Sequence, residues 1–204
     1  MGIPKALLPF GPERMLDRVI RLLGEVVEPI VVVAAPRQEL ADLPAGVVLA
    51  RDRVEGEGPL EALYAGLSAV AGRADAAYVM GCDTPLLAPG FVRRMVELLA
   101  DHQIAVPRED HFFHPLAAVY RADVLPQIAA LLAEDRMRPI FLFDRVDTRE
   151  VPVAELRDVD PELLTLANLN TPQDYLRALE RAGFEAPAEI LGELAGGTRG
   201  GEAG

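Results

Sequence analysis

The sequence predicts an α/β fold: a Rossmann-like, doubly wound and mostly parallel sheet with helices on both faces. Apolar, β-branched runs alternate along the chain with segments whose apolar residues recur at helical spacing, as they do in βαβ units. Runs such as PIVVVAA are apolar at every position, which is typical of strands buried on both faces of a parallel sheet. The length of 204 residues suits one domain with a sizeable core.

The individual strands and helices follow in order from these patterns. We expect strands at 29–35, 46–51, 76–81, 103–107 and 149–153. We expect helices at 15–23, 60–70, 91–99 and 171–184. The segment 111–147 is less regular, and we interpret it as a mixed region folded over one end of the sheet, where a substrate could sit.

The start of the helix at 171–184 is marked by its residue types. Thr171 is the expected cap, Pro172 the first helical residue and Asp174 the acidic third position. After Phe184 the chain becomes rich in glycine and lacks aromatic residues. We therefore expect one domain at 1–184 and a disordered tail at 185–204.

Charge and cysteine content narrow the classes of function. The net charge of −12 argues against a large nucleic-acid or anionic membrane surface, which would need clustered Lys and Arg. A small phosphorylated ligand remains possible because it needs only a few local cations and a metal. Cys82 is the single cysteine, which excludes an intrachain disulfide framework. We see no signal peptide and no apolar run of roughly 18 residues, so we expect a cytoplasmic protein.

The candidate functional residues follow the predicted strands, because a parallel sheet binds ligands at the carboxyl ends of its strands. Asp83 follows the run YVMG and could bind Mg²⁺, or it could cap the turn into the next helix. Asp52 also lies at a strand end. Gly58 and Pro59 then lead into a helix, either as a loop that a nucleotide approaches or as an ordinary connector. Lys5 could bind a phosphate or could simply be a surface residue.

Histidines and amides supply the remaining candidates. His111 and His114 could form a zinc site with Cys82, but no second pair at ligand spacing supports it. His114 could instead orient a turn or touch a substrate. Asn168 and Asn170 directly precede the capped helix, either as part of the capping turn or as ligand-binding amides.

Five stretches in one order resemble the molybdenum cofactor guanylyltransferases, within the wider MobA-like nucleotidyltransferases. They are MGIPKALLPFG, GPLEALYAGL, CDTPLL, HPLAAVY and NLNTPQDY, and they span residues 1 to about 180. The resemblance implies a sheet of the nucleotide-diphospho-sugar transferase type. It also implies a Mg²⁺-dependent enzyme that moves GMP from GTP to the terminal phosphate of molybdopterin and releases pyrophosphate, with other molybdenum cofactor proteins as possible partners.

The resemblance also assigns roles to individual residues. Lys5 would hold the nucleotide phosphates, and Asp83 would bind Mg²⁺, so these two are the catalytic candidates. Asp52 would lie in the guanosine pocket, with Gly58 and Pro59 beside the nucleotide. Asn168 and Asn170 would lie near the acceptor or the metal, and we assign them, with His114, to the acceptor side.

Two departures from the family pattern affect these expectations. The family normally begins with an apolar strand and a loop of the type LAGGxSxRMGxxK, whereas this sequence starts at the final Met-Gly of that loop. We therefore expect the natural reading frame to start upstream. Ala34 stands where some relatives carry a polar residue that touches the nucleotide.

Other functions remain open at this stage. The donor could be CTP, and the acceptor could be a sugar phosphate or another cofactor. Without its phosphate loop, the chain could also be a catalytically inactive relative that binds a pterin or a partner protein.

Overall fold

The computed structural model describes residues 4–40, 42–53 and 58–187. Its strands are β1 (Pro9–Phe10), β2 (Glu13–Arg14), β3 (Val31–Ala34), β4 (Val48–Arg51), β5 (Ala76–Met80), β6 (Ile104–Glu109), β7 (Phe112–Phe113), β8 (Ala117–Arg121) and β9 (Thr148–Pro152). Its α-helices are α1 (Met15–Gly24), α2 (Pro59–Val70), α3 (Pro89–Leu99), α4 (Leu125–Ala133), α5 (Ile140–Phe143) and α6 (Pro172–Arg181). Short 3-10 helices lie at Lys5–Leu7, Ala122–Val124, Val153–Leu156 and Leu164–Leu166.

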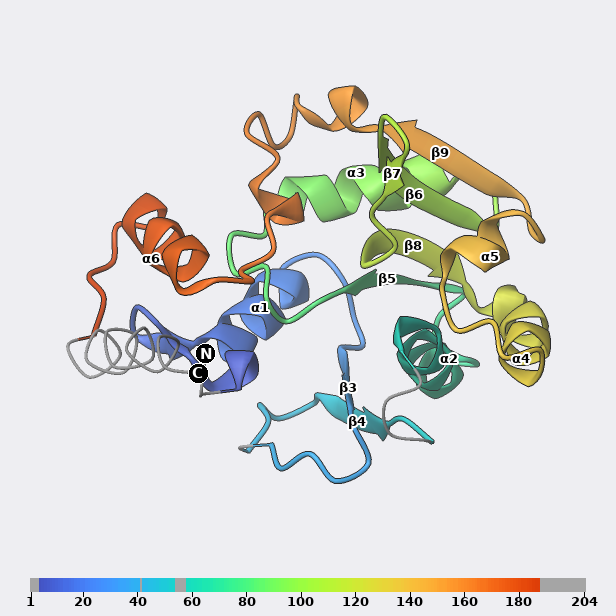
Figure 1. Cartoon of the computed structure of the whole chain (residues 1–204), viewed down its shortest axis with the longest axis horizontal. Helices are drawn as coiled ribbons and strands as arrows, with labels where there is room; N and C mark the ends of the chain where they lie inside the picture. The colour runs from blue at the N-terminus through green and yellow to red at the C-terminus, as the bar shows by residue number, and fades with distance from the viewer. Residues whose placement is uncertain (1–3, 41, 54–57, 188–204) are drawn as a thin grey trace, which may run out of the picture.

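These elements form the expected α/β fold, but the main sheet is mixed rather than mostly parallel. The sheet runs in the order β5–β8–β6–β7, with β9 on β6 (Figure 1). Strand β9 is parallel to β6, whereas β8 is antiparallel to both of its neighbours. Strands β3 and β4 form a separate parallel pair. All five expected strands and all four expected helices are confirmed, with ends that differ by at most a few residues.

The interpretation of 111–147 as a region folded over one end of the sheet was wrong. Its strand β8 lies inside the sheet, between β5 and β6, with Tyr78 opposite Val119 and Ile104 opposite Tyr120. The first four residues of β8 are buried. A strand covered on both faces needs no alternation of polar and apolar residues, so the run AAVY carries no period-two signal.

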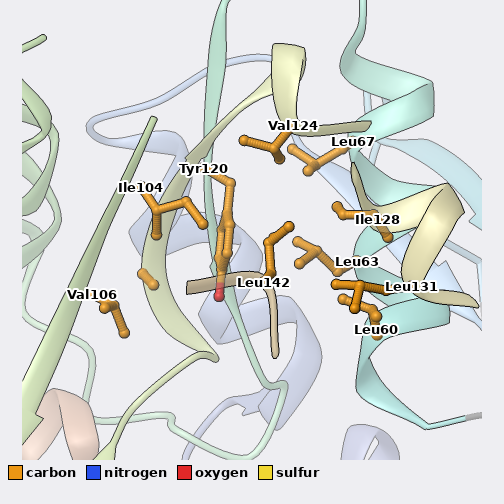
Figure 2. Close-up of a cluster of buried hydrophobic side chains, with 11 residues drawn as sticks. Leu60, Leu63, Leu67, Ile104, Val106, Tyr120, Val124, Ile128, Leu131 and Leu142 are labelled. Carbon is orange, nitrogen blue, oxygen red and sulfur yellow. The ribbon is translucent and has the colours of Figure 1, made fainter. Parts of the chain in front are cut away.

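One face of the sheet is covered by α2 and α4, which pack their leucines against β6 and β8 (Figure 2). Tyr120 lies at the centre of this core, and its hydroxyl donates a hydrogen bond of 2.8 Å to the Pro115 carbonyl. The opposite face is covered by α3, through Phe91, Met95 and Leu99. The sheet therefore has helices on both faces, as the sequence predicts.

A separate core joins the amino-terminal hairpin to α6. Phe10 on β1 makes edge-to-face contacts with Tyr175 of α6 and with Phe184. Gly11, which turns the hairpin, has a φ of +65°, and a Cβ there would lie 2.6 Å from the Phe184 ring. This turn therefore requires glycine. The core holds the two ends of the described chain together (Figure 1).

The predicted helix cap is confirmed. The Thr171 hydroxyl accepts a hydrogen bond from the backbone N–H of Asp174, whose carboxylate accepts one from the Thr171 N–H. Pro172 is the first residue of α6. The expected tail falls almost wholly on residues 188–204, outside the described residues. Across the described part of the chain, no helix is long and apolar enough to cross a membrane.

The two tyrosines on β5 and β8 provide a matched test of the core. Tyr120→Phe removes the hydrogen bond to the Pro115 carbonyl, and we expect the free energy of unfolding to fall by about 1 kcal/mol. The hydroxyl of Tyr78 is buried and has no hydrogen-bond partner among the described residues. Tyr78→Phe should therefore leave stability unchanged or raise it. Urea unfolding of both variants checks the difference, and equal losses would contradict it.

Candidate active site

Lys5, Asp83 and Asn170 meet at the carboxyl end of β5. The Lys5 Nζ donates hydrogen bonds of 2.9 Å to Asp83 Oδ2 and of 2.9 Å to Asn170 Oδ1. The Lys5 and Asp83 side chains are both partly exposed, so this cluster is open to a ligand. The structure thus brings together three of the residues that the sequence singles out.

The turn after β5 positions the Asp83 side chain. The Thr84 hydroxyl donates to the Gly81 carbonyl at 3.1 Å and closes this turn. A Cβ on Gly81 would lie 2.5 Å from Asp83 Oδ1, so glycine leaves the space that the carboxylate occupies. The backbone N–H of Leu169 donates to the Asp83 carbonyl at 2.9 Å. This bond fixes the segment that carries Asn170 beside Asp83.

Packing of its neighbours positions Lys5 at the start of a short 3-10 helix. Ala6 and Leu8 are buried on either side of the turn, and the Leu8 N–H donates to the Lys5 carbonyl at 3.1 Å. The hydroxyl of Tyr175 donates to the Pro9 carbonyl, which ties this segment to α6. The backbone around Lys5 is thus fixed by the core between the hairpin and α6.

The cap of α6 positions Asn170. The Asp174 carboxylate accepts hydrogen bonds from the backbone N–H groups of Asn170 and Thr171, at 3.2 and 2.8 Å. Hydrogen bonds from Thr171, reinforced by the Arg177 guanidinium, lower the pKa of Asp174 to about 2. Asn168 lies two residues before Asn170 and is exposed. In the described hydrogen bonds of the cluster, Asn170 and not Asn168 contacts Lys5.

Asp52 lies after β4, where its N–H donates to the Ala34 carbonyl at 3.0 Å. Its Oδ1 is buried and has no hydrogen-bond partner among the described residues. Burial, with a smaller contribution from the nearby Glu61 carboxylate, raises the pKa of Asp52. Glu61 itself is buried and accepts hydrogen bonds from the Arg53 guanidinium at 2.7 and 2.8 Å. Among the described residues, Asp52 Oδ1 is therefore an acceptor without a donor.

Gly58 and Pro59 form the start of α2. Gly58 has a φ of +82° and precedes the helix, and Pro59 is its first residue. Glycine is favoured at such a positive φ, and proline at the first helical position. The preceding residues 54–57 lie outside the described part of the chain.

His114 lies at the same end of the sheet as Asp83. The pairing of Met80 with Ala117 places the turn before β8 beside the turn after β5. The Nε2 of His114 is buried without a partner among the described residues, and burial lowers the pKa of this imidazole. Its ring contacts Phe112 edge-on, with 5.0 Å between the ring centroids. His114 is therefore a neutral side chain with one unused ring nitrogen.

The structure lends no support to the zinc site considered for His111, His114 and Cys82. Among the described residues, no group of three His, Cys, Asp or Glu side chains could hold a metal ion. Burial raises the pKa of the Cys82 thiol, which keeps it protonated, whereas zinc binds the thiolate.

A hard divalent cation fits the Asp83 cluster better. Mg²⁺ takes oxygen ligands and uses one or two carboxylates, with water and phosphate oxygens in the other positions. Asp83 Oδ2 and Asn170 Oδ1 already bind one positive charge together, the Lys5 ammonium. The donor chemistry of the site thus fits a hard divalent cation such as Mg²⁺, to which Asp83 offers a carboxylate.

Comparison with known proteins identifies the family. The profile of the MobA-like NTP transferase domain matches residues 1–149. The chain belongs to this family. A probable molybdenum cofactor guanylyltransferase from Mycobacterium avium is 36% identical over 188 residues, which cover 89% of each chain. Another, from Methanosarcina mazei, is 31% identical over 184 residues, covering 84% of this chain and 80% of the relative.

Solved structures show the same fold. The molybdopterin-guanine dinucleotide biosynthesis protein A of Archaeoglobus fulgidus superposes with a TM-score of 0.73 at 20% identity, over 89% of this chain and 92% of that one. The 2-C-methyl-D-erythritol 4-phosphate cytidylyltransferase of Thermus thermophilus gives 0.64 at 17% identity, over 88% and 94%. The MobA-like domain thus has the nucleotide-diphospho-sugar transferase type of sheet that the sequence predicts.

Two residues that shape the site of this MobA-like chain were not predicted from its sequence. Glu61 is the buried partner of Arg53 and contributes to the raised pKa of Asp52. Gly81 leaves room for the Asp83 carboxylate. Glu61 could have been predicted from the sequence, because it is an acidic residue at the third position of a helix that begins at Pro59 and is preceded by Gly58. Gly81 carried no signal of its own, since the contact depends on the path of the following turn.

The carboxyls of Asp52 and Asp174 have pKa values shifted in opposite directions, and their removal should affect stability oppositely. A raised pKa means that the charged Asp52 destabilises the folded state at neutral pH, so Asp52→Asn should raise the Tm at pH 7 by about 1–3 °C. This gain should vanish once the pH falls below about 4, where Asp52 is protonated in both states.

Asp174→Asn is the control of opposite sign. The lowered pKa of Asp174 adds stability that is fully present above its unfolded pKa and is lost as the pH falls towards about 2. Its removal should therefore lower the Tm at pH 7. Calorimetry between pH 3 and pH 8 measures both variants, and a lower Tm for Asp52→Asn at pH 7 would contradict the interpretation of Asp52.

Proposed function

We propose that this chain transfers GMP from GTP to the terminal phosphate of molybdopterin and releases pyrophosphate. The observation that carries this proposal is the Lys5 ammonium held between Asp83 and Asn170. This contact places a cation and two oxygen ligands together at the edge of the sheet where ligands bind. Relatives that are 31–36% identical are named molybdenum cofactor guanylyltransferases, which supports the same activity here. We place the reaction in the cytoplasm, with GTP and molybdopterin as small-molecule substrates.

The donor nucleotide binds along the carboxyl ends of β4 and β5. Lys5 contacts the phosphates as a point charge, and Asp83 holds Mg²⁺ beside them. Gly58 and Pro59 let the nucleotide approach the start of α2. Asp52 accepts hydrogen bonds from the N1–H and the 2-amino group of guanine, which are the two donors on that edge of the base. The base thus supplies donors to the Asp52 carboxylate that the described residues do not supply to its Oδ1, whereas cytosine has only its 4-amino group as a donor on that edge.

The acceptor binds on the other side of Asp83. His114 contributes its unused Nε2, and the exposed amides of Asn168 and Asn170 contact the acceptor phosphate. Asn170 touches the Lys5 ammonium directly, so it lies between the donor and acceptor sides. This arrangement requires no covalent intermediate on the protein.

The chain's residues align the two substrates and neutralise charge. An oxygen of the acceptor phosphate attacks the α-phosphorus of GTP, the new P–O bond forms, and the bond to pyrophosphate breaks. Lys5 stabilises the charge that develops on the phosphate oxygens, and Asp83 and Asn170 orient the Lys5 ammonium. Mg²⁺, when bound, supplies charge neutralisation to the same oxygens. Local positive charge also explains how a chain of net charge −12 binds two anions.

Replacement of Asp83 tests the proposed chemistry. Asp83→Asn keeps the shape of the side chain but removes its charge, so we expect kcat for GMP transfer to fall by about 100-fold or more, with an unchanged circular dichroism spectrum. The measurement is transfer of label from α-³²P GTP to molybdopterin at several Mg²⁺ concentrations.

Cys82 provides the matched control, because it is the neighbouring residue and has no assigned chemical role. Cys82→Ser should retain most of the activity. Near-full activity in Asp83→Asn would contradict the assignment of Asp83, and binding of GTP without turnover in the unaltered chain would support the inactive relative instead.

The role of Asp52 is tested with other nucleotides in place of GTP. The unaltered protein should use GTP with a kcat/KM at least about tenfold above that for ITP, which lacks the 2-amino group, and should use CTP poorly. Asp52→Ala should lower the value for GTP and bring it close to that for ITP. A preference for GTP that survives in Asp52→Ala, or efficient use of CTP, would contradict the proposed base contact.

A further inference from the structure

The side chain of Arg18, on α1, contacts the turn that carries Asp83 and the core between the amino-terminal hairpin and α6. Its Nε donates a hydrogen bond of 2.8 Å to the carbonyl of Pro85, two residues after Asp83. Its guanidinium carbon lies 5.1 Å from the ring centroid of Phe10 and 5.5 Å from that of Phe184. Figure 1 shows α1 accordingly between α6 and the carboxyl end of β5. One guanidinium thus joins the segments that form the candidate site.

The Pro85 carbonyl lies where the turn after β5 enters two cores. The next residue, Leu86, packs against the core of the hairpin and α6. Leu87 is buried against α1 and α3. The hydrogen bond from Arg18 therefore holds the backbone at the point between Asp83 and these two anchors.

Stability alone is a poor explanation for a guanidinium at this position. The Arg18 side chain is 17% exposed, whereas that of Arg21 on the same helix is 50% exposed. Burial lowers the pKa of Arg18 despite the Glu13 carboxylate, whose Oε1 lies 3.7 Å from Arg18 Nη1. Apolar residues of similar volume often replace such a buried, partly paired charge without loss of stability. The directed donor and the flat face of the group are what an apolar residue lacks.

We propose that Arg18 is a positioning residue of the active site: its guanidinium, held between two aromatic rings, fixes the Pro85 carbonyl and through it the Asp83 carboxylate. The rings belong to the core that fixes the segments of Lys5 and Asn170. Arg18 therefore couples the position of Asp83 to the positions of both of its partners. Its effect on catalysis rests on the function proposed above, whereas its effect on the turn does not.

Such a brace is needed because the contacts within the cluster are exchangeable. The Lys5–Asp83 ion pair is partly exposed, and it loosens when a phosphate takes over the Lys5 ammonium. The bond from Arg18 to the Pro85 carbonyl is made to the backbone and stays in place when a ligand binds. A misplacement of about 1 Å at a group that orients reacting atoms can lower the rate about 100-fold. Loss of the brace should therefore lower kcat more than it raises KM.

Substitutions at Arg18 separate its two contacts. Arg18→Lys places a methylene where arginine has Nε, and places the ammonium where arginine has its guanidinium carbon. This variant loses the donor to Pro85 but keeps a positive charge between the rings. Arg18→Met loses both the donor and the charge. The matched control is Arg21→Lys, about one turn further along α1, because Arg21 also pairs with Glu13 and has Glu25 as its other described partner.

Hydrogen exchange tests the brace without any substrate. The N–H of Leu87 donates to the Thr84 carbonyl at 3.3 Å, and that of Leu169 donates to the Asp83 carbonyl at 2.9 Å. In both Arg18 variants these two amides should exchange at least about tenfold faster than in the unaltered chain. The amides of β8 should change by less than about twofold, because the opening is local. Arg21→Lys should leave all of these rates unchanged.

Steady-state kinetics of GMP transfer at saturating Mg²⁺ is the second measurement. In both Arg18 variants kcat should fall about tenfold, with the KM for GTP within about threefold of the original. Arg21→Lys should change neither. Faster exchange with an unchanged kcat would overturn the positioning role.

Three exchange results would also overturn the proposal. They are unchanged rates at Leu87 and Leu169 in Arg18→Lys, an effect confined to Arg18→Met, and an equal acceleration in β8, which would indicate general destabilisation. If one Arg18 variant does not fold, the other decides, because both lack the Nε donor. If the unaltered chain transfers no GMP, the proposed function fails, and the exchange rates alone decide the role of Arg18.

Discussion

The Lys5 ammonium links three segments that are remote in the sequence, and the candidate site depends on this link. It joins the amino-terminal turn, the end of β5 and the segment before α6 through two hydrogen bonds of 2.9 Å. An ion pair as exposed as that of Lys5 and Asp83 contributes at most about 1 kcal/mol to stability. The segments must therefore be held by their own packing. The core of Phe10, Tyr175 and Phe184 supplies it, so the ion pair is free to exchange its partners for ligands.

The electrostatics of the site follow from how each carboxylate is satisfied. Asp174 accepts hydrogen bonds from two backbone N–H groups and stays charged, which fixes Asn170. Glu61 is buried and satisfied by Arg53. Asp52 lies near Glu61, its pKa is raised, and its Oδ1 has no hydrogen-bond partner among the described residues. In the described part of the chain, Asp174 and Glu61 are thus paired with donors, whereas the carboxylate that we propose as the contact to the base has an oxygen without one. Such differences between neighbouring acids are common at functional sites.

The sequence predicted most of the fold because its signals were local. The strands β3, β4 and β5 are apolar runs of the expected kind, and α6 begins with a capping box that four residues define. The family resemblance grouped Lys5, Asp83 and Asn170, and the structure brings their side chains together. Strand β8 could not be predicted in this way, because its place is set by pairing with β5 and β6. The Glu61–Arg53 pair likewise depends on how the turn after β4 packs against α2.

Strand β5 connects the site to the rest of the sheet, and its two edges differ. On one edge, β8 pairs with all five of its residues and fixes their register. On the other edge lies an apolar cavity of about 600 Å³ between β5 and β3, and no strand of the described residues pairs with that edge. Asp83 lies three residues after the end of this strand, so its position relies on pairing of β5 from one side and on the hydrogen bond that the Leu169 N–H donates to the Asp83 carbonyl.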